Sequence, residues 1–358
     1  MPKGLRRILL VRLSHLGDVV HALPVFHALR AAHPEAELAW AVQREFAGLL
    51  RGLPGLARVI EFDRRGGARA WFALQRELGA FRADWSIDAQ GNVKSAAAAL
   101  VSGARVRTGL ARADWRERAG AWLVNDRAPS AAGPHAIDRM EALVRHVAGP
   151  RAALRFDPAL SPEELARDDD GEPRAVREAD VLLHLATPGD VRAWPPERFA
   201  ELARELAARG KRVLVVSGPA EEELGRALAR ELDAPDVAHW VGQRGLRRLA
   251  RAFTLGGARG AAFVGCDSGP MHLAWACGLR VVCLAGPQDA RRTGPWPVPP
   301  PVRGDASGPR HAVVRARDEP ACAPCLARRC THAEGPVCMR RVASEDVIAA
   351  LESFARGA

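Results

Sequence analysis

Long apolar runs are missing from this sequence of 358 residues. No uninterrupted apolar stretch approaches the roughly 20 residues that a membrane-spanning helix needs. The opening stretch, MPKGLRRILLVRLSHLGD, places charged residues too soon after its short apolar segment for a signal peptide. These absences argue against spanning helices and secretion, and they predict a protein that stays in the cytoplasm.

Lysine is scarce, because only Lys3, Lys94 and Lys211 contribute to the 52 basic residues and arginine supplies the rest. The formal net charge is still +10, and a basic protein gains affinity for nucleic acid by releasing counterions from phosphates. However, the arginines are spread along the chain and do not gather in one tail. Such a surface equally suits anionic phospholipid or a phosphorylated sugar, since guanidinium binds phosphate in bidentate fashion. We therefore expect no nucleic-acid partner.

Internal repeats of solenoid length are also absent. Hydrophobic residues make up 48% and charged residues 26% of the chain, values typical of folded proteins, which excludes a wholly disordered or collagen-like chain. A chain of 358 residues is too long for one ordinary core and suits two domains of about 150 residues each. Two domains with a cleft between them are the expectation.

Short apolar runs alternate with segments of helical length in the first half of the chain. We expect strands at residues 8–12, 37–42, 58–62 and 83–89, and helices at residues 19–32, 69–78 and 93–101. This alternation is typical of a parallel sheet with crossover helices, and therefore of an α/β domain.

The pattern breaks at residues 156–179, a stretch with three prolines, a run of three aspartates and few large apolar residues. It predicts an exposed linker and a boundary near residue 165, which gives domains of residues 1–165 and 166–358. A second α/β unit then follows, with strands at residues 180–186, 212–217, 261–265 and 280–284, and helices at residues 196–209, 221–232, 270–277 and 344–356.

The first loop of interest, residues 13–18, follows the first expected strand, where open α/β sheets bind their ligands. It contains one glycine, Gly17, and lacks the GxGxxG pattern of dinucleotide-binding loops, which disfavours a dehydrogenase. Asp18 stands just before a helix. It either caps that helix with its carboxylate or accepts a proton from an incoming hydroxyl.

A second candidate is the string CDSGPMH at residues 266–272, which joins a strand to a helix. Pro270 lies just inside the helix start with Ser268 and Gly269 ahead of it, so backbone N–H groups are exposed to an anion. These features predict a pyrophosphate-binding helix start. His272, within the first turn, either donates to the same phosphate or is an ordinary surface histidine.

A third loop, residues 185–195, follows another strand and carries Thr187 and Arg192. The topology places this hydroxyl and this cation at the same edge of the sheet as residues 266–272. Arg192 either neutralises a leaving diphosphate or is a solvated loop arginine, and the loop alone does not decide.

Seven strings occur in order along the chain: RLSHLGDVVHALP, DAQGNVKSA, WRERAGAWLVN, HAIDR, DVRAWPPERF, DSGPMH and GPQDARRTGPWP. Together they resemble the heptosyltransferases of glycosyltransferase family 9, which build the inner core of lipopolysaccharide. The resemblance covers nearly the whole chain. It implies an α/β fold with GT-B architecture, in which two Rossmann-like domains present parallel sheets to a central cleft. The first domain, residues 1–165, then binds the acceptor, and the second, residues 166–358, binds the nucleotide sugar.

The resemblance also implies two catalytic residues. Asp18 matches the general base that takes the proton of the acceptor hydroxyl, which attacks the anomeric carbon in one inverting displacement. Arg192 stands where the family often has lysine; it keeps the positive charge but lacks a titratable ammonium.

The nucleotide-sugar site is carried over in the same way. Thr187 matches a phosphate-contacting hydroxyl, although Pro188 follows it where the family loop is often polar. Asp267 matches a residue that orients the donor. Glu221 resembles the ribose-binding carboxylate, and neighbouring Glu222 competes for that match. The residues expected to bind the nucleotide sugar, of which the last three hold the diphosphate, are Thr187, Glu221, Asp267, Ser268, Gly269 and His272.

Basic residues in the first half match positions with which the family grips the phosphates and carboxylates of Kdo-lipid A. Each is alternatively an ordinary surface residue of an arginine-rich chain, so affinity for an anionic lipid face would come from the set. The expected acceptor-binding residues are Arg64, Arg65, Arg69, Arg116, His135 and Arg139.

Four of the seven cysteines lie close together as a CxxC pair followed by two more: Cys322, Cys325, Cys330 and Cys338. In a reducing cytoplasm, four thiolates favour a tetrahedral zinc or iron ion over two disulfides. Disulfide or redox pairing and plain reduced thiols stay open. In certain protein-glycosylating relatives, a cysteine cluster of this general type holds iron. A metal ion here would be structural, and catalysis would need no cofactor.

The resemblance therefore predicts a cytoplasmic enzyme, peripheral to the inner face of the cytoplasmic membrane. It would transfer heptose from ADP-heptose to an anionic glycolipid acceptor, either Kdo-lipid A or a core heptose. Two alternatives stay open. One is a relative that heptosylates a protein or uses another nucleotide sugar; the other, of a different class, is a basic scaffold that binds anions or nucleic acid.

Overall fold

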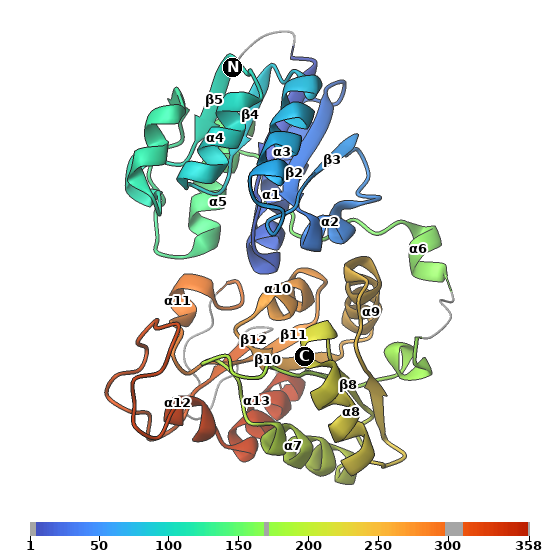
Figure 1. The fold of residues 1–358 in the computed structure, drawn as a ribbon. Coiled ribbons are helices and arrows are strands. Elements are labelled where there is room, and N and C mark those ends of the chain that lie inside the picture. Colours follow the sequence, from blue (N-terminus) through green and yellow to red (C-terminus); the bar gives the residue numbers. More distant parts are fainter. Residues whose placement is uncertain (1–4, 168–171, 298–310, 357–358) are drawn as a thin grey trace. The chain divides into compact units, whose positions relative to one another are not determined.

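The computed structural model describes residues 5–167, 172–297 and 311–356 (Figure 1). The chain divides into two compact units, Met1–Ser161 and Pro162–Ala358. Each unit contains one parallel six-stranded sheet, so the predicted α/β class with two Rossmann-like domains is confirmed. The boundary expected after residue 165 lies inside helix α6 (Pro162–Ala166), which belongs wholly to the second unit.

The first sheet has the strand order β3-β2-β1-β4-β5-β6, with every neighbouring pair parallel. Its central strands are short apolar runs such as RILLV and are buried, as expected for a parallel sheet covered by helices on both faces. The strands are β1 (Arg7–Val11), β2 (Glu37–Gln43), β3 (Arg58–Phe62), β4 (Trp85–Asp88), β5 (Val106–Gly109) and β6 (Asp126–Arg127).

Helices cover both faces of this sheet (Figure 1). Helix α1 packs against α5, and α3 packs against α4. The core under α3 and α4 includes Leu9, Val11, Ile60, Leu74 and Leu78, all at most 1% exposed. The helices are α1 (Leu16–Ala32), α2 (Arg44–Leu50), α3 (Gly67–Phe81), α4 (Val93–Val101) and α5 (Ala136–Ala148).

The second sheet repeats this design with the order β12-β11-β10-β7-β8-β9. Its strands are β7 (Val181–His184), β8 (Val213–Val216), β9 (Val237–Trp240), β10 (Ala262–Cys266), β11 (Arg280–Leu284) and β12 (His311–Val314). The further helices of the unit are α7 (Pro196–Ala208), α8 (Glu222–Glu231), α9 (Leu246–Ala258), α10 (Gly269–Ala276), α11 (Ala290–Thr293), α12 (Val337–Arg340) and α13 (Ser344–Arg356).

Both sheets have the same topological switch point. The first strand of each unit pairs on one side with the second and on the other with the fourth, so β1 lies between β2 and β4 and β7 lies between β8 and β10. Connections leave such a pair of strands in opposite directions, which opens a crevice at their carboxyl ends. The loops after β1, β4, β7 and β10 are therefore the places where each unit offers a binding site.

The segment at residues 156–179 is not the exposed linker that its composition predicts. In its described part, Val176 and Ala179 are 1% and 2% exposed, and the carboxylate of Glu172 lies 2.6 Å from the Arg251 guanidinium of α9. The prediction is wrong because Glu164 and Glu172 pair with arginines on α9, so the described part of the segment from residue 162 onward packs onto the second unit.

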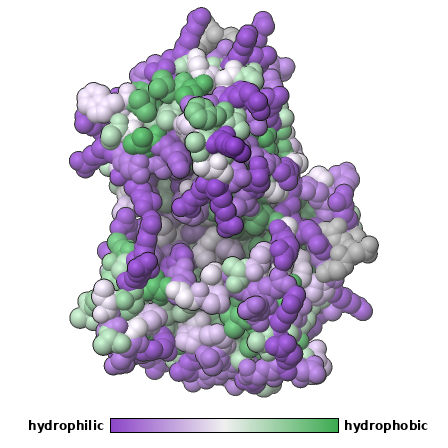
Figure 2. Space-filling model, viewed as in Figure 1, coloured by the Kyte–Doolittle hydropathy of each residue, from purple (hydrophilic) through white to green (hydrophobic). Residues whose placement is uncertain are grey.

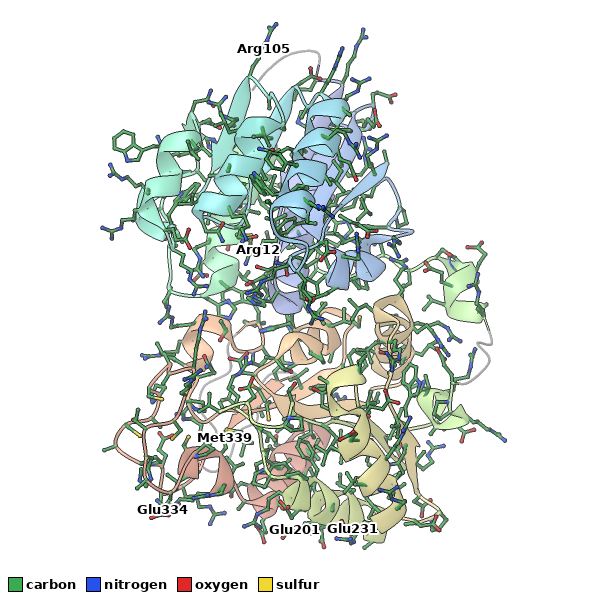
Figure 3. The ribbon with its side chains drawn as sticks, viewed as in Figure 1. Arg12, Arg105, Glu201, Glu231, Glu334 and Met339 are labelled. Atoms are coloured by element: carbon green, nitrogen blue, oxygen red, sulfur yellow. The ribbon has the colours of Figure 1, made fainter. Side chains whose placement is uncertain are left out.

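Hydrophilic side chains cover most of the visible face of both units, with smaller apolar areas on each (Figure 2). Arginines occur at both ends of the first unit, as the widely separated Arg12 and Arg105 show (Figure 3). In the described part of the chain, no helix combines the length and apolar character needed to cross a bilayer.

Candidate active site

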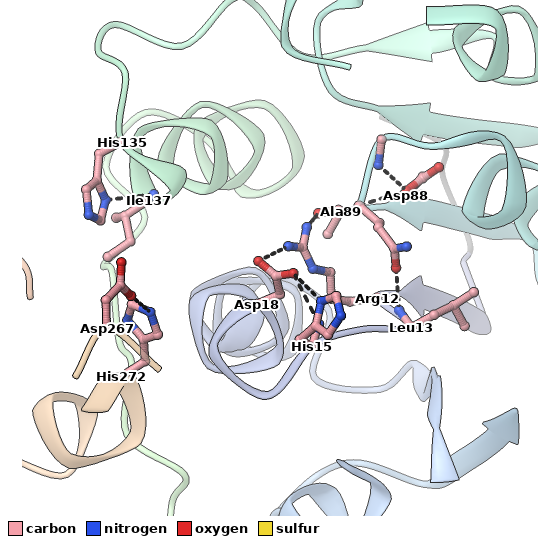
Figure 4. Close-up of polar contacts among 12 residues, drawn as sticks. Arg12, Leu13, His15, Asp18, Asp88, Ala89, His135, Ile137, Asp267 and His272 are labelled. Atoms are coloured by element: carbon pink, nitrogen blue, oxygen red, sulfur yellow. Dashed lines mark hydrogen bonds and ion pairs between the residues drawn. The ribbon is translucent and has the colours of Figure 1, made fainter. Parts of the chain in front are cut away.

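The loop after β1 brings together a cation and a carboxylate (Figure 4). Arg12, 9% exposed, follows β1 directly and donates from Nη1 to the carbonyl oxygen of Ala89, beyond β4. Its Nη2 lies 2.6 Å from Oδ1 of Asp18. The loop is fixed a second time because the Leu13 N–H donates to Oε1 of Gln90 at 2.7 Å. The two loops at the switch point therefore hold Asp18 in place.

Asp18 is the third residue of α1, and not the residue that caps it. His15 occupies the cap position, and its backbone N–H donates to Oδ2 of Asp18 at 3.1 Å. Burial alone raises the pKa of Asp18, but the Arg12 charge and the hydrogen bonds from His15 outweigh it and hold the pKa below the ordinary value. The side chain still keeps 37% of its surface exposed, so this ionised carboxylate is accessible to a hydroxyl.

A second carboxylate, Asp88, lies at the end of β4 and is fully buried. It accepts hydrogen bonds from the backbone N–H groups of Gln90 and Gly91 at 2.8 and 3.0 Å and from the Ser95 hydroxyl at 2.8 Å. Burial raises the pKa of Asp88 to about 6, although these hydrogen bonds oppose the shift. Because no part of it is accessible, Asp88 shapes the loop after β4 and does not contact a substrate.

The predicted acceptor-binding residues all follow strand ends of the first sheet. Arg64 and Arg65 lie between β3 and α3, and Arg69 lies in the first turn of α3; all three are exposed. Arg116 is also exposed, and its N–H donates to the Gly91 carbonyl at 3.0 Å. This set stays a prediction, because the structure does not test which residues bind the acceptor.

Two further members of that set belong to α5. His135 caps this helix, and its Nδ1 accepts from the Ile137 N–H at 3.1 Å (Figure 4). It is 1% exposed, and its Nδ1 is used to cap the helix. Arg139 lies one turn further along α5 and is half-buried.

The second unit holds a cavity of about 220 Å³ at the carboxyl ends of β7, β8 and β10. Five of the predicted site residues line it: Thr187, Arg192, Glu221, Asp267 and Ser268. Gly269 and His272 lie beside it in the first turn of α10. The sequence therefore predicted residues that the fold brings to one place, from loops up to 81 positions apart (Thr187 to Ser268).

Glu221 and Thr187 form one side of the cavity. The Thr187 hydroxyl donates to Oε1 of Glu221, and the Gly218 N–H donates to Oε2 at 3.0 Å. A Cβ at Gly218 would lie 2.9 Å from that same oxygen, so a larger residue there would displace the carboxylate from its present position. Glu222 points elsewhere, to Arg226 and to Arg244 at 2.8 Å. Of the two competing glutamates, Glu221 is the one at the cavity.

Arg192 is held in a fixed orientation on another side. Asp190 accepts from its Nε and Nη2 at 2.9 and 2.6 Å, and its Nη1 donates to the backbone carbonyl of Asp267 at 2.9 Å. Hydrogen bonding to Arg192 lowers the pKa of Asp190 despite partial burial. A guanidinium that is oriented in this way and 38% exposed suits a bidentate contact with phosphate.

Asp267 connects three elements. It begins the turn after β10. Nε2 of His272 in α10 lies 3.4 Å from its Oδ1 (Figure 4), and the Thr293 hydroxyl of α11 donates to its Oδ2 at 2.7 Å. Ser268 follows as the cap residue of α10, with Pro270 in the first turn. The start of α10 therefore offers backbone N–H groups to an anion in the cavity.

The four clustered cysteines are not arranged as a metal site. Cys322 and Cys325 are exposed, Cys330 is half-buried and Cys338 is buried. Burial raises the pKa of Cys338, and nearby charge on the other three thiols raises it further, so the thiols are neighbours. Yet among residues 5–167, 172–297 and 311–356 no three His, Cys, Asp or Glu side chains form a group that could hold a metal ion. The structure gives no support to the predicted zinc or iron.

Sequence reasoning missed three residues that this geometry brings forward. Arg12 orients Asp18, Asp190 orients Arg192, and Thr293 contacts Asp267. Thr293 lies inside the string GPQDARRTGPWP, which is one of the strings that resemble family motifs, although the residue itself was not singled out. Asp190 stands two residues before Arg192. An acidic residue this close to an arginine is a sequence signal that the two side chains form an ion pair.

Comparison with known proteins shows which family and fold the chain resembles. Residues 71–325 match glycosyltransferase family 9 (heptosyltransferase). The chain is 31% identical to lipopolysaccharide heptosyltransferase 1 of Pseudomonas aeruginosa, with 97% of this chain and 98% of the relative covered. It is also 31% identical to lipopolysaccharide heptosyltransferase 1 of Escherichia coli K12, over 79% and 88% of the two chains.

Solved structures show the same architecture. Escherichia coli heptosyltransferase WaaC with ADP matches with a TM-score of 0.73 and 26% identity, covering 97% of this chain and 99% of that one. The same enzyme with ADP-2-deoxy-2-fluoro heptose matches with a TM-score of 0.70 over the same shares. A family 9 glycosyltransferase from Veillonella parvula, with a TM-score of 0.74, 18% identity and coverage of 99% and 98%, shows the fold alone.

Proposed function

This chain belongs to glycosyltransferase family 9, the heptosyltransferases, and we propose that it transfers heptose from ADP-heptose to an acceptor of the lipopolysaccharide inner core. It is an enzyme with the GT-B fold of that family. The relatives named heptosyltransferase 1 are 31% identical to it, whereas a heptosyltransferase 2 from Salmonella typhimurium is 26% identical. This difference favours Kdo-lipid A as the acceptor over a core heptose.

The observation that carries the proposal is the cavity at the carboxyl ends of β7, β8 and β10. It combines a buried carboxylate, Glu221, with an oriented guanidinium, Arg192, and the start of α10. A nucleoside diphosphate has matching chemistry, because its ribose hydroxyls donate to a carboxylate and its phosphates accept from a guanidinium and from backbone N–H groups. The complexes of WaaC with ADP and with a fluorinated ADP-heptose support ADP-heptose as the donor.

In this proposal the residues of the cavity bind different parts of the donor. Glu221 and Thr187 bind the ribose and a phosphate, Ser268, Gly269 and His272 hold the diphosphate, and Asp267 orients the sugar. When the bond from the anomeric carbon to the diphosphate oxygen breaks, negative charge develops on that oxygen. Arg192 then stabilises the leaving ADP, because it is oriented before the reaction by Asp190.

Asp18 acts as the general base in the same step. The acceptor hydroxyl oxygen forms the new bond to the anomeric carbon as its proton passes to the Asp18 carboxylate, and the configuration at that carbon inverts. The ion pair with Arg12 keeps Asp18 ionised and therefore able to accept the proton. A base with a lowered pKa provides less driving force, so the leaving-group stabilisation by Arg192 has correspondingly more to contribute.

The acceptor side of the proposal rests on the basic residues after the strands of the first sheet. Arginines bind phosphates and carboxylates of an anionic glycolipid, and a set of exposed cations also favours the anionic inner face of the cytoplasmic membrane. We assign acceptor binding to the first domain and donor binding to the second. The acceptor residues of the assignment are Arg64, Arg65, Arg69, Arg116, His135 and Arg139.

No cofactor takes part in the proposed reaction. The zinc or iron ion on the four cysteines stays a hypothesis based on their spacing alone, which the metal content of the purified protein checks. The named relatives are all heptosyltransferases, so a basic nucleic-acid-binding scaffold finds no support among them. A protein acceptor remains a second candidate, distinguished by a glycosylated protein in place of a glycolipid product.

The proposal is tested with the variant Asp18→Asn. We expect kcat for ADP release from ADP-heptose in the presence of Kdo-lipid A to fall by about 100-fold or more. The amide keeps the size of the side chain but cannot take the proton. The thermal stabilisation of the protein by ADP should stay as in the wild type. The cavity at the carboxyl ends of β7, β8 and β10, which we call the donor cavity, is made by other loops.

Asp233→Asn is the matched control, since Asp233 is exposed in the loop after α8 and should leave both readouts unchanged. Full activity of Asp18→Asn would remove Asp18 from its role as base. A wild type that is stabilised by UDP or GDP but not by ADP would instead change the donor.

A further inference from the structure

A larger cavity, of about 710 Å³, lies at the opposite edge of the second sheet. It is lined at the amino ends of β7, β10 and β11 by Val181, Ala262 and Arg280, and by residues of α7 and α13. The donor cavity lies at the carboxyl ends of the same sheet. A strand of four or five residues is about 13–17 Å long, so the two cavities are separate sites. We name this one the amino-edge cavity.

One wall of the amino-edge cavity is apolar. Leu206 of α7 and Ile348 and Phe354 of α13 line it and are 4–7% exposed. Leu351, also in the lining, is half-buried. Because these side chains come from two helices that pack against each other, the wall is a fixed part of the second unit. The volume of the amino-edge cavity is in the range of cavities that bind small ligands in proteins.

The rest of the lining is strongly cationic. It contains five basic side chains and two acidic ones, Asp180 and Glu352. The acids are engaged, because Asp180 lies 3.3 Å from Arg212 and Glu352 lies 2.8 Å from Arg209. Three basic residues of the lining have no such match: Lys211, Arg259 and Arg280.

In the described part of the chain these three residues form no close ion pair with a carboxylate, although Asp180 interacts with the charges of Lys211 and Arg259 at longer range. Arg259 donates to the carbonyl oxygens of Leu255 and Val176 at 2.9 and 3.3 Å, and Arg280 donates to that of Phe354 at 3.1 Å. Burial lowers the pKa of Arg259, and the nearby charges of Arg212 and Arg177 lower it further, although Asp180 and Glu178 partly offset the shift. Like charges therefore crowd here, and an anion would relieve the repulsion.

We propose that the amino-edge cavity binds an amphipathic anion. Its phosphate or carboxylate head would lie among Lys211, Arg259 and Arg280, and its apolar body would lie against Leu206, Ile348 and Phe354. This chemistry fits a small amphiphile in solution or the head and upper chain of an anionic lipid. The inference goes beyond the proposed heptose transfer and does not depend on it, because no residue of the donor cavity is involved.

The test is a calorimetric titration of the full chain with decyl phosphate, below its micelle concentration and in the presence of saturating ADP. Saturation with ADP blocks the donor cavity; if ADP does not bind, the proposed function fails, and the titration is done without it. We expect one saturable site, and a Kd for inorganic phosphate that is weaker by about tenfold or more, since phosphate alone leaves the apolar wall unused.

Lys211→Glu places a negative charge in the cavity at an exposed position and should weaken decyl phosphate by about tenfold or more. Arg230→Glu makes the same charge reversal on the exposed end of α8, outside this lining, and should change Kd by less than about twofold. Arg259→Gln provides a second loss of charge if Lys211→Glu proves unstable.

Vesicles of phosphatidylglycerol identify the source of the ligand. Vesicle binding that Lys211→Glu abolishes supports an anionic lipid, and decyl phosphate binding without vesicle binding supports a free amphiphile. The proposal is overturned if decyl phosphate gives no saturable binding, if inorganic phosphate binds as tightly, or if Lys211→Glu and Arg230→Glu have equal effects.

Discussion

Arg12 determines the charge state of the carboxylate that we propose as the base. The guanidinium is 9% exposed and is oriented by the Ala89 carbonyl, so it meets Asp18 in one geometry at 2.6 Å. Without it, partial burial would raise the pKa of Asp18 against the remaining hydrogen bonds from His15 and increase the protonated fraction, which cannot accept a proton. Arg12 is thus a positioning residue: it acts on the reaction through Asp18.

Replacing Arg12 by methionine should move the acidic limb of the pH profile of kcat/KM to higher pH. The sign follows from the pKa of Asp18. In the wild type Arg12 lowers it, so Asp18 is ionised throughout the neutral range. Loss of Arg12 raises that pKa, and a larger fraction of Asp18 is then protonated, and inactive, at a given mildly acidic pH.

The measurement is kcat/KM between pH 5 and pH 9 for the wild type, Arg12→Met and Arg12→Lys. Lysine keeps the charge but not the planar fork, so its profile should stay near that of the wild type even if its maximum rate falls. A profile of Arg12→Met that falls in amplitude without shifting along the pH axis would contradict the electrostatic role.

The chemistry-bearing residues of the site were predictable from the sequence, but the residues that orient them were not. Asp18, Thr187, Glu221 and Asp267 all follow strands, where the topology places them at a binding edge. Arg12 is oriented by a backbone carbonyl 77 residues away in the sequence. Arg192 is fixed by a carbonyl 75 residues away, and no local pattern encodes such a distant partner.

At the scale of elements, α11 is a short helix that holds the turn after β10. Asp289 caps it by accepting from the Arg291 N–H, and Thr293 at its end donates to Asp267 at 2.7 Å. The carboxylate is also contacted by His272 of α10 at 3.4 Å. Two helices therefore determine the direction in which Asp267 presents its carboxylate to the donor cavity.

Thr293→Val should weaken ADP-heptose binding by about two- to tenfold, the loss expected for one neutral hydrogen bond. Valine keeps the shape of the side chain and removes the hydroxyl. Donor affinity is measured by titration of the protein with ADP-heptose. Thr293→Ser, which keeps the hydroxyl, is the control and should bind as the wild type does. Equal affinity of Thr293→Val and the wild type would show that α11 does not position Asp267.

Most of the longer strands and helices were predictable from their apolar patterns, and several elements were missed. The strands expected at residues 8–12, 37–42 and 280–284 correspond to β1, β2 and β11, because a strand buried on both faces is one apolar run. Helix α9 escaped prediction. Its Leu246, Leu249 and Phe253 recur at helical spacing, so the signal was present in the sequence and was overlooked.

Strand β6 escaped for a different reason. It is two residues long, Asp126–Arg127, and contains no apolar side chain. Its pairing with Thr108 and Gly109 of β5 is what makes it a strand. Such an element depends on its neighbour, so the sequence alone carries no signal for it.

At the scale of the whole molecule, the segment that leads into the second sheet is held to that unit by ion pairs. Arg247 lies 2.5 Å from Glu164 of α6, and Arg251 lies 2.6 Å from Glu172. The side chains of Arg251 and Glu172 are 4% and 7% exposed. Buried pairs of this kind resist loss of one partner, because the remaining charge stays in a poorly solvated place.

Glu172→Gln should therefore destabilise the second unit by about 3 kcal/mol, the lower end of the range for breaking a buried pair. The glutamine amide fills the same space but removes the charge that faces Arg251. Glu178→Gln is the matched control, because the Arg174–Glu178 pair is exposed, with side chains 89% and 38% accessible. Its cost should stay within about 0.5 kcal/mol.

Urea unfolding of the full chain, followed by hydrogen exchange in α9, measures both variants. If the buried pair holds the segment on α9, exchange in α9 should accelerate in Glu172→Gln and stay unchanged in Glu178→Gln, and exchange in α1 of the first unit should be the same in all three proteins. Equal destabilisation by the two substitutions would mean that burial of the pair has no energetic consequence. The segment would then be held by Val176 and Ala179, which are 1% and 2% exposed, through apolar packing alone.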